Sequence, residues 1–208
     1  PDHWQAILEA GLLHPPFTLR VNCRHGDVAT YLQRLTEAEL PARQTGADAV
    51  ILDKAVPVQS LPGFDQGNVS VQDAGAQWAA HLLDAQPGER VLDACAAPGG
   101  KTGHILERAD VELTALDLDA MRLARVQENL DRLQLHAMLI QGDAAQPDAW
   151  WDGRLFDRIL ADVPCSASGV VRRNPDIKWL RRPDDIAQFA AQQAVMLDAL
   201  WRLLVPGG

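Results

Sequence analysis

The sequence is poor in cysteine and in positive charge, and it lacks any long apolar run. Three cysteines, Cys23, Cys95 and Cys165, are too few and too scattered for a disulfide framework or a zinc site, so we expect no metal. Nineteen basic against 28 acidic residues give a net charge of −9, which alone argues against a nucleic-acid partner. No apolar run reaches the roughly 18 residues of a membrane helix, and the first residues show no signal pattern, so we expect a cytoplasmic protein.

The 208 residues, of which 47% are hydrophobic, can bury one large core or one large and one small core. Residues 1–60 combine a β-rich run at 17–22, a helical pattern at 27–35 and a second strand at 49–52, which predicts a small α+β unit. The following stretch, 61–68, is dense in Pro, Gly and Asn and is typical of a connection. We therefore expect a small domain at 1–60 and a second domain at 61–208.

The second domain shows a regular alternation of short apolar strands with longer helices. The strands are expected near 90–94, 111–116, 136–140 and 157–161, and the helices near 73–83, 101–108, 119–133 and 184–204. Strands that alternate with helices of this length form a parallel sheet covered on both faces. The pattern predicts a doubly wound α/β fold.

An acidic residue stands at the end of each of these strands. The four are Asp93, Asp117, Asp143 and Asp162. A doubly wound sheet binds its ligand at the carboxyl ends of its strands, where such side chains meet. A single acid there is often a helix cap, but four in succession favour a ligand site.

The loop after the first of these strands decides between three cofactors. It reads Cys95-Ala96-Ala97-Pro98-Gly99-Gly100-Lys101-Thr102, and its small residues let a ligand approach the backbone. A phosphate-binding P-loop is excluded, because it needs Gly where Cys95 stands. A dinucleotide site is disfavoured, because its fingerprint is Gly-x-Gly-x-x-Gly and the glycines here are adjacent. S-adenosylmethionine fits better, because it has an amino-acid end, a ribose diol and an adenine but no pyrophosphate. Asp117 is placed for the ribose hydroxyls and Asp143 for the adenine amino group, although each could instead cap a helix or form a turn.

A cysteine follows the fourth strand, in the run Asp162-Val163-Pro164-Cys165-Ser166. A lone cysteine is often inert packing, but one beside a carboxylate at a strand end is a candidate nucleophile. The chemistry that needs it is carbon methylation of a pyrimidine. Position C5 of cytosine is a weak nucleophile, so a thiolate first adds to C6, and an acid at N3 stabilises the adduct.

Residues 172–182 form a basic segment with five basic groups and one acid, a local charge of +4. Basic groups around an aromatic residue, here Trp179, are a recurring pattern for single-stranded RNA. The alternative is a solvated loop with Trp179 in the core. If the segment binds RNA, the contacting residues are Arg172, Arg173, Lys178, Arg181 and Arg182. The pair at 150–151, also tryptophan, is interpreted as packing.

These motifs together resemble the RNA cytosine-5 methyltransferases of the NOL1/NOP2/Sun family. Residues 93–102 are similar to that family's cofactor motif, and residues 71–77 to its segment before the catalytic core. Residues 162–166 resemble its Asp-Ala-Pro-Cys-Ser motif, with Val163 in place of Ala. The resemblance covers nearly the whole chain.

The resemblance implies a Rossmann-like S-adenosylmethionine-dependent methyltransferase domain behind a small RNA-binding domain. The implied cofactor contacts are Cys95, Ala96, Ala97, Pro98, Gly99, Gly100, Lys101, Asp117, Asp143 and Asp162. Lys101 and Asp162 would also reach the target base. The implied substrate is 16S rRNA, at a cytosine in a small-subunit hairpin loop (position 967 in standard numbering), and we expect a monomer.

In that family the attacking thiolate belongs to a second cysteine, in a Thr-Cys-Ser motif after a Pro-Gly-Gly turn, and the cysteine that corresponds to Cys165 assists release of the methylated RNA. The chain ends at such a turn, so we expect the principal nucleophile beyond Gly208 and a NusB-like domain before Pro1. The 208 residues would then bind the cofactor but would not catalyse methyl transfer. Two alternatives stay open: Cys165 is itself the nucleophile, or the chain is a non-catalytic RNA-binding module of ribosome assembly.

Overall fold

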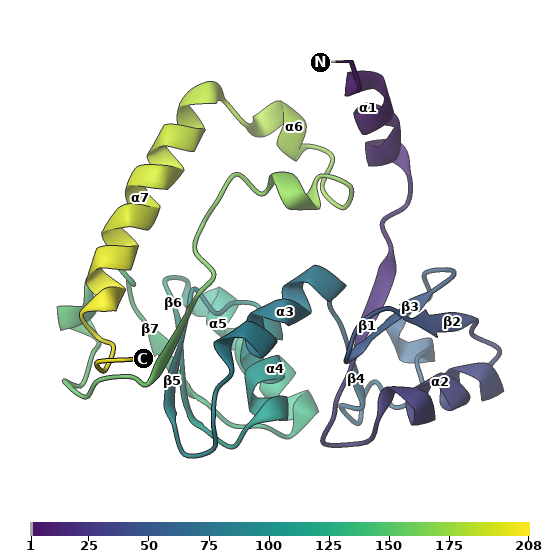
Figure 1. The fold of residues 1–208 in the computed structure, drawn as a ribbon, viewed down its shortest axis with the longest axis horizontal. Helices are drawn as coiled ribbons and strands as arrows, with labels where there is room; N and C mark the ends of the chain where they lie inside the picture. Colours follow the sequence, from purple (N-terminus) through teal and green to yellow (C-terminus); the bar gives the residue numbers. More distant parts are fainter. Residues whose placement is uncertain (1) are drawn as a thin grey trace.

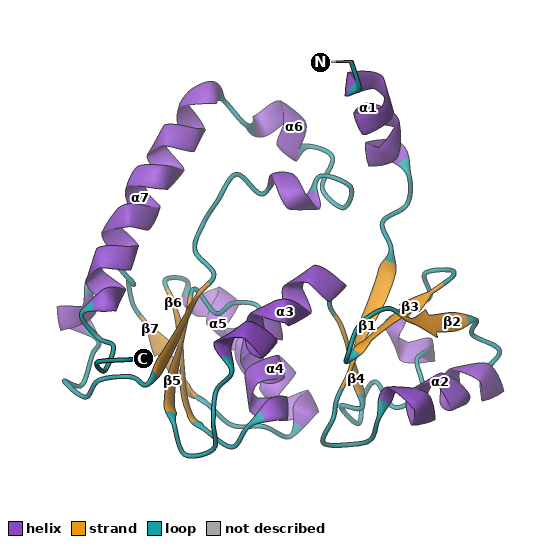
Figure 2. Cartoon of the chain, viewed as in Figure 1, coloured by secondary structure: helices purple, strands orange, loops and turns teal. Residues whose placement is uncertain are grey.

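The computed structural model describes residues 2–208, which form a small α+β unit and a larger α/β unit, with two helices of the larger unit between the two sheets (Figures 1 and 2). The first unit is an antiparallel sheet with the strand order β2-β3-β1-β4. Its elements are α1 (Trp4–Leu12), β1 (Phe17–Val21), α2 (Val28–Glu37), β2 (Ala42–Gln44), β3 (Ala49–Leu52), the 3-10 turn η1 (Val58–Ser60) and β4 (Val69–Val71).

Helix α2 packs on this sheet because its apolar residues recur at helical spacing. Val28, Tyr31 and Leu35 are buried in the core of the small unit, where strands β1 and β3 supply Leu19 and Val50. The helix begins at a side-chain cap, in which the carboxylate of Asp27 accepts a 2.7 Å hydrogen bond from the backbone N–H of Thr30.

The second unit is a parallel sheet with the order β7-β6-β5-β8. Its elements are α3 (Ala74–Leu83), β5 (Arg90–Ala94), α4 (Gly100–Arg108), β6 (Glu112–Asp117), α5 (Ala120–Leu133), β7 (Met138–Gln141), η2 (Pro147–Ala149), β8 (Arg158–Ala161), η3 (Ser168–Val170), α6 (Ile177–Leu180) and α7 (Pro183–Trp201).

Helices cover both faces of this parallel sheet. On one face Val91 and Ala115 share a core with residues of α3, α4 and α5. On the other face Leu92 packs with Met196 and Leu200 of α7. The prediction of a doubly wound α/β fold is therefore confirmed, and the sheet's carboxyl edge opens toward the segment that joins β8 to α7 (Figure 1).

The predicted strands and long helices are confirmed within a few residues, whereas β2, β4 and α6 were not predicted. Strand β4 lies after the Pro- and Gly-rich stretch and pairs with β1, so it completes the small sheet. The division at residue 60 stays a prediction. Because β4 belongs to the small sheet, we propose that the boundary between the units lies later, between β4 and α3. Within residues 2–208, no helix is both long and apolar enough to cross a membrane.

Candidate active site

The four strand-end acids lie along one edge of the parallel sheet. Asp93 and Asp117 are the last or next-to-last residues of β5 and β6, and Asp143 and Asp162 follow β7 and β8. Because these strands are parallel neighbours, their carboxyl ends meet at the same edge. The fold thus brings together the acids that the sequence placed far apart.

Asp93 is fully buried and only half satisfied. Its Oδ2 accepts a 2.6 Å hydrogen bond from the hydroxyl of Thr102, while its Oδ1 has no partner among the described residues. Burial raises the pKa of Asp93 to about 7, and the negative charges of Asp162 and Asp117 add to the shift. A buried acceptor without a donor costs stability, which is typical of a site prepared for a ligand.

Asp117 holds the loop that follows β5. It is 3% exposed, and its two carboxylate oxygens accept hydrogen bonds from the backbone N–H groups of Ala97 (3.0 Å) and Asp119 (3.1 Å). The guanidinium of Arg122 lies 3.7 Å from the same carboxylate. Each carboxylate oxygen can accept more than one hydrogen bond, so Asp117 keeps acceptor capacity for a ligand.

The loop of residues 95–99 is fixed between β6 and α5. Arg122 donates a 2.8 Å hydrogen bond to the carbonyl of Ala97, and Gly99 adopts a φ of +92°. A Cβ at Gly99 would come within 3.1 Å of Val126, so close packing as well as φ favours glycine there. Burial raises the pKa of Cys95 to about 11, and nearby carboxylates contribute, so its thiol stays protonated at neutral pH.

Asp143 forms a tight turn at the end of β7. Its oxygens accept hydrogen bonds from the backbone N–H of Ala145 (2.8 Å) and from the amide of Gln146 (3.1 Å). The indole N–H of Trp150 donates to the backbone carbonyl of Asp143. The predicted alternative, a turn former, therefore describes its contacts here, and a role in ligand binding stays a prediction.

The loop after β8 carries Cys165 beside an ion pair. Lys101, in the first turn of α4, donates to the carboxylate of Asp162. The Cys165 thiol is exposed, and its sulfur accepts a 3.4 Å contact from the backbone N–H of Ala167. The amide of Gln193 on α7 anchors this loop through a 2.8 Å hydrogen bond to the carbonyl of Pro164.

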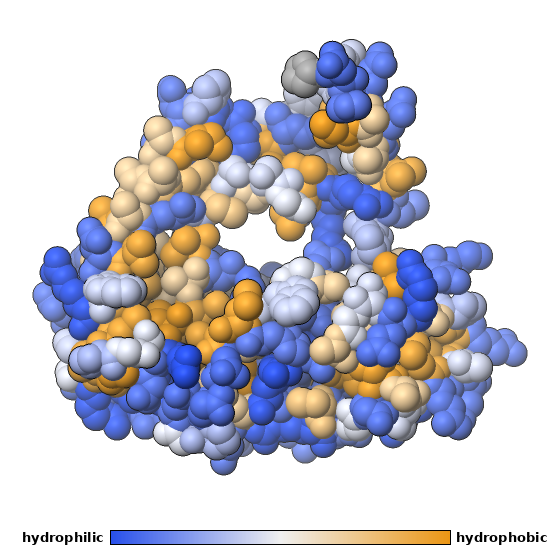
Figure 3. Space-filling model, in the orientation of Figure 1, coloured by the Kyte–Doolittle hydropathy of each residue, from blue (hydrophilic) through white to orange (hydrophobic). Residues whose placement is uncertain are grey.

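The basic segment, residues 172–182, bridges toward the small unit. Arg172 donates to the carbonyl of His14, and Arg173 donates to the carbonyl of Pro16 and to Asp73. In the space-filling view the segment forms an arch with an opening beneath it (Figure 3). Arg172 and Arg173, two of the five predicted RNA contacts, thus donate hydrogen bonds to residues outside the segment.

The rest of the basic segment faces solvent or its own loop. Arg181 donates a 2.7 Å hydrogen bond to the carbonyl of Ser166, while Lys178 and Arg182 are exposed. Trp179 is 85% exposed, so the alternative that placed it in the core is wrong. The prediction that residues 150 and 151 serve packing is confirmed, since both lie against the core beneath α7.

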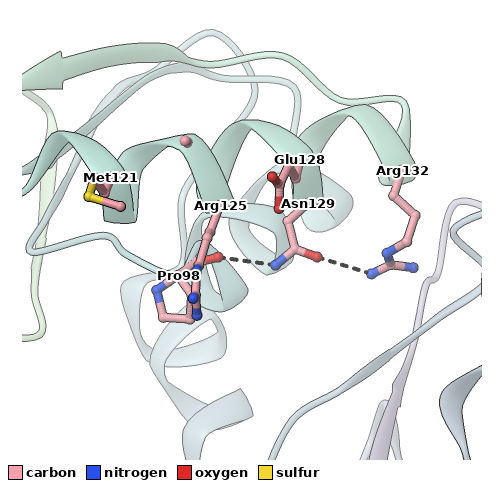
Figure 4. A pocket seen from close by; sticks show the side chains of 7 residues that line it. Pro98, Met121, Arg125, Glu128, Asn129 and Arg132 are labelled. Atoms are coloured by element: carbon pink, nitrogen blue, oxygen red, sulfur yellow. Dashed lines mark hydrogen bonds between the residues drawn. The ribbon is translucent and has the colours of Figure 1, made fainter.

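A separate surface cavity of about 790 Å³ lies on the outer side of α5 (Figure 4). Asn129 donates a 3.1 Å hydrogen bond to the carbonyl of Pro98, and Arg132 donates to the Asn129 side chain. The other lining residues are Met121, Ala124, Arg125 and Glu128. This cavity borders the back of the 95–99 loop, not the row of strand-end acids.

Sequence reasoning grouped Asp93 with the other strand-end acids but gave it no individual contact, and it assigned no role to Arg122. Asp93 carried the same signal as the other acids, since it stands at a strand end, but nothing in the sequence showed its burial. Arg122 carried no signal, because a basic residue early in an exposed helix is usually solvated.

A parallel sheet of this order, with acids along its carboxyl edge and a glycine-containing turn after its first strand, defines a Rossmann-like cofactor-binding domain. The family model described as "16S rRNA methyltransferase RsmB/F" matches residues 80–208, and an RsmF/B-like ferredoxin-like domain matches residues 1–59. The chain belongs to the RsmB/F family of 16S rRNA methyltransferases.

Individual relatives agree with this assignment. Proteins named ribosomal RNA small subunit methyltransferase B from Vibrio vulnificus and Pseudomonas putida are each 53% identical over the whole chain, which covers 50% and 49% of their lengths. A crystal structure of a methyltransferase homologue from Pyrococcus horikoshii is 30% identical, with a TM-score of 0.84 over 100% of this chain and 67% of that one. The chain spans about half the length of the curated relatives it matches.

Proposed function

We propose that the chain forms the cofactor-binding core of an S-adenosylmethionine-dependent methyltransferase that methylates C5 of a cytosine in small-subunit rRNA. The observation that carries the proposal is the row of four carboxylates beside a fixed glycine-containing loop and an exposed thiol, in a chain of the RsmB/F family. S-adenosylmethionine supplies an electrophilic methyl group on a sulfonium.

The donor set of the edge fits this cofactor. Asp93 has an unpartnered buried oxygen, and Asp117 and Asp143 can each accept further hydrogen bonds. The edge therefore has hydrogen-bond acceptors to spare, and a ligand that supplies donors would satisfy them. S-adenosylmethionine offers donors in its ammonium, ribose hydroxyl and adenine amino groups. Its sulfonium and ammonium are cationic, and a cluster of carboxylates attracts cations.

The chemistry on the base falls to the loop after β8 and to its ion pair. A thiolate adds to C6, which places electron density on C5. A hydrogen bond or proton donated to N3 by Lys101 or Asp162 stabilises the adduct. After methylation, a base takes the C5 proton, the C6–S bond breaks with departure of the thiolate, and the C5–C6 double bond is restored. Of the two cysteines at this edge, the pKa of about 11 makes Cys95 unsuitable as the nucleophile.

Two assignments of the attacking thiolate remain in competition. The resemblance assigns attack to a cysteine beyond Gly208 and release to Cys165. The exposure of Cys165 and the backbone N–H directed at its sulfur are compatible with either role, attack on C6 or release of the product. A hairpin RNA that contains 5-fluorocytosine traps the adduct, because fluorine blocks loss from C5. An adduct on this chain that Cys165→Ser abolishes and Cys95→Ser retains assigns the attack to Cys165.

Calorimetric titration with S-adenosylmethionine tests the cofactor site. We expect binding by the wild-type chain and about a hundredfold weaker binding by Asp117→Ala. This variant would lose the proposed contacts to the cofactor and also the hydrogen bond from the backbone N–H of Ala97 that holds the loop. Asp110→Ala is the matched control, because Asp110 is exposed and lies at the opposite end of β6. Wild-type protein that does not bind S-adenosylmethionine would overturn the proposal.

The RNA part of the proposal is tested with unmodified small-subunit rRNA. We expect binding that weakens steeply with salt, since phosphate contacts release counterions. Replacement of Lys178 and Arg182, which are exposed, by Ala should reduce the salt slope by about two. Methylated product, where turnover occurs, should be 5-methylcytidine on nucleoside analysis, and any other methylated nucleoside would contradict the assignment of C5.

A further inference from the structure

A buried arginine of the small unit reaches the helix that carries the cofactor loop. Arg20 is the next-to-last residue of β1 and is 1% exposed. Its Nε and Nη2 donate hydrogen bonds of 2.8 and 2.7 Å to the two carboxylate oxygens of Glu107, near the end of α4. Paired donors of this kind fix the geometry of both partners more firmly than a single contact does.

The third nitrogen of the same guanidinium reaches the beginning of α4. Nη1 of Arg20 donates a 2.6 Å hydrogen bond to the carbonyl of Gly100 and a 2.7 Å hydrogen bond to the amide oxygen of Gln72. Gly100 is the first residue of α4 and directly precedes Lys101, which pairs with Asp162. One side chain therefore contacts both ends of the helix.

A glycine of α4 lies next to the guanidinium of Arg20. Residues 100, 103 and 107 are spaced so that they lie on one face of the helix. A Cβ at Gly103 would stand 3.5 Å from Nη2 of Arg20 and 2.7 Å from the Leu133 side chain. A Cβ at this position would be in ordinary van der Waals contact with Arg20 but would clash with Leu133, so the Leu133 contact is the one that requires glycine.

Other residues of the small unit contact the same helix. Asp48 accepts hydrogen bonds from His104 and Arg108, both at 3.3 Å, and the side chains of Cys23 and Arg24 donate to the carbonyl of Glu107. Helix α4 lies between the two sheets (Figure 1). Its contacts with the small unit fall at both ends and in its second half, at residues 100, 104, 107 and 108. The small unit therefore contacts the helix that directly follows the 95–99 loop, and a shift of one would move the other.

We propose that Arg20 is a positioning residue of the methyltransferase site: through Gly100 and Glu107 it sets the place of α4, and with it the 95–99 loop and Lys101. The proposal rests on the proposed function, because it assumes that this loop binds S-adenosylmethionine. It assigns the small unit a role in cofactor binding, in addition to the RNA contacts predicted for it.

The test compares two buried arginines by cofactor affinity and by thermal stability. Arg20→Lys keeps the charge but cannot bond both Glu107 oxygens and Gly100 together. The matched control is Arg90→Lys at the amino end of β5, where Arg90 is 8% exposed and bonds Glu112 and Asp152, remote from the loop. Calorimetric titration with S-adenosylmethionine is carried out well below the melting midpoint of every variant.

We expect both variants to melt at lower temperature, but only Arg20→Lys to bind S-adenosylmethionine about tenfold more weakly, the factor associated with one charge-assisted hydrogen bond. Unchanged affinity in Arg20→Lys, or equal losses in both variants, would overturn the positioning role. Absence of binding by the wild-type chain would instead overturn the proposed function, so the two failures are distinguishable.

A second variant covers the case in which Arg20→Lys does not fold. The double substitution Arg20→Leu/Glu107→Leu removes both charges at once and leaves no unpaired buried ion, a replacement that buried ion pairs often tolerate. It also lacks the bond to Gly100. We expect the same loss of affinity, and a folded double variant with wild-type affinity would refute the proposal.

Discussion

Asp93 allows a prediction in which the sign of a stability change depends on pH. The carboxyl is 0% exposed, and burial raises its pKa from 3.8 to about 7 against the opposing hydroxyl of Thr102 and charge of Lys101. Between these two values the unfolded chain has lost the proton while the folded chain retains it. Stability from this group is therefore present at low pH, falls as the pH rises through this window, and is constant above it.

The gap between 3.8 and about 7 corresponds to a cost of roughly 4 kcal/mol above neutral pH. Asn at this position is neutral at every pH, has nearly the same shape, and keeps an oxygen for the hydroxyl of Thr102. We expect Asp93→Asn to be about 2 to 4 kcal/mol more stable than the wild type at pH 8.5 and close to it at pH 4.5. A buried group that costs stability is typical of a functional site.

Urea unfolding followed by tryptophan fluorescence measures this difference at the two pH values. Other titrating groups are present in both proteins, so subtraction isolates Asp93. The control Asp110→Asn changes an exposed carboxyl and should stay within about 0.5 kcal/mol of wild type. A variant that is less stable than wild type at pH 8.5, or a difference that does not change with pH, would refute the reasoning.

Three further predictions concern the surroundings of the site. Burial lowers the pKa of His104 from 6.5 to about 4, so the unfolded chain takes up a proton first and stability falls as pH falls through that range; His104→Gln should remove up to roughly 3 kcal/mol of this loss in urea unfolding. Gly103→Ala should cost about 1 to 3 kcal/mol, measured in the same way, because its Cβ would press on the buried Leu133 side chain. Iodoacetamide at pH 8 should alkylate Cys165 well before Cys95, as peptide mass mapping would show, because Cys165 is exposed and the pKa of Cys95 is about 11. Faster reaction at Cys95 would contradict the burial and the raised pKa of its thiol.

The sheet and its edge of acids could be predicted because their signals are local. Each strand of the parallel sheet is a short apolar run with an acid at or just after its end, and parallel pairing places all the acids at one edge. Strands β2 and β4 carry three residues each, too few for a recognisable alternation. Strand β4 exists because β1, about fifty residues earlier, offers it a free edge.

Contacts between the two units were invisible in the sequence for a related reason. Arg20 stands in a strand pattern where the neighbouring side chains are apolar, and its partner Glu107 is 87 residues away. A lone basic residue in such a strand is ordinarily read as the solvent side of the sheet. Burial of this charge depends on a packed helix that supplies the carboxylate, which only the assembled fold contains.

The strand-end acids lie along one edge of the sheet but differ in their hydrogen-bond and ion-pair partners. Asp117 anchors the 95–99 loop, Asp143 closes a turn, Asp162 pairs with Lys101, and Asp93 keeps an oxygen free. An edge of this sign suits a cationic methyl donor. The basic segment of residues 172–182 spans the space above it with a local charge of +4, which suits phosphates. A net charge of −9 and the proposed RNA substrate are therefore compatible, because charges separated by more than about a Debye length are largely screened from one another.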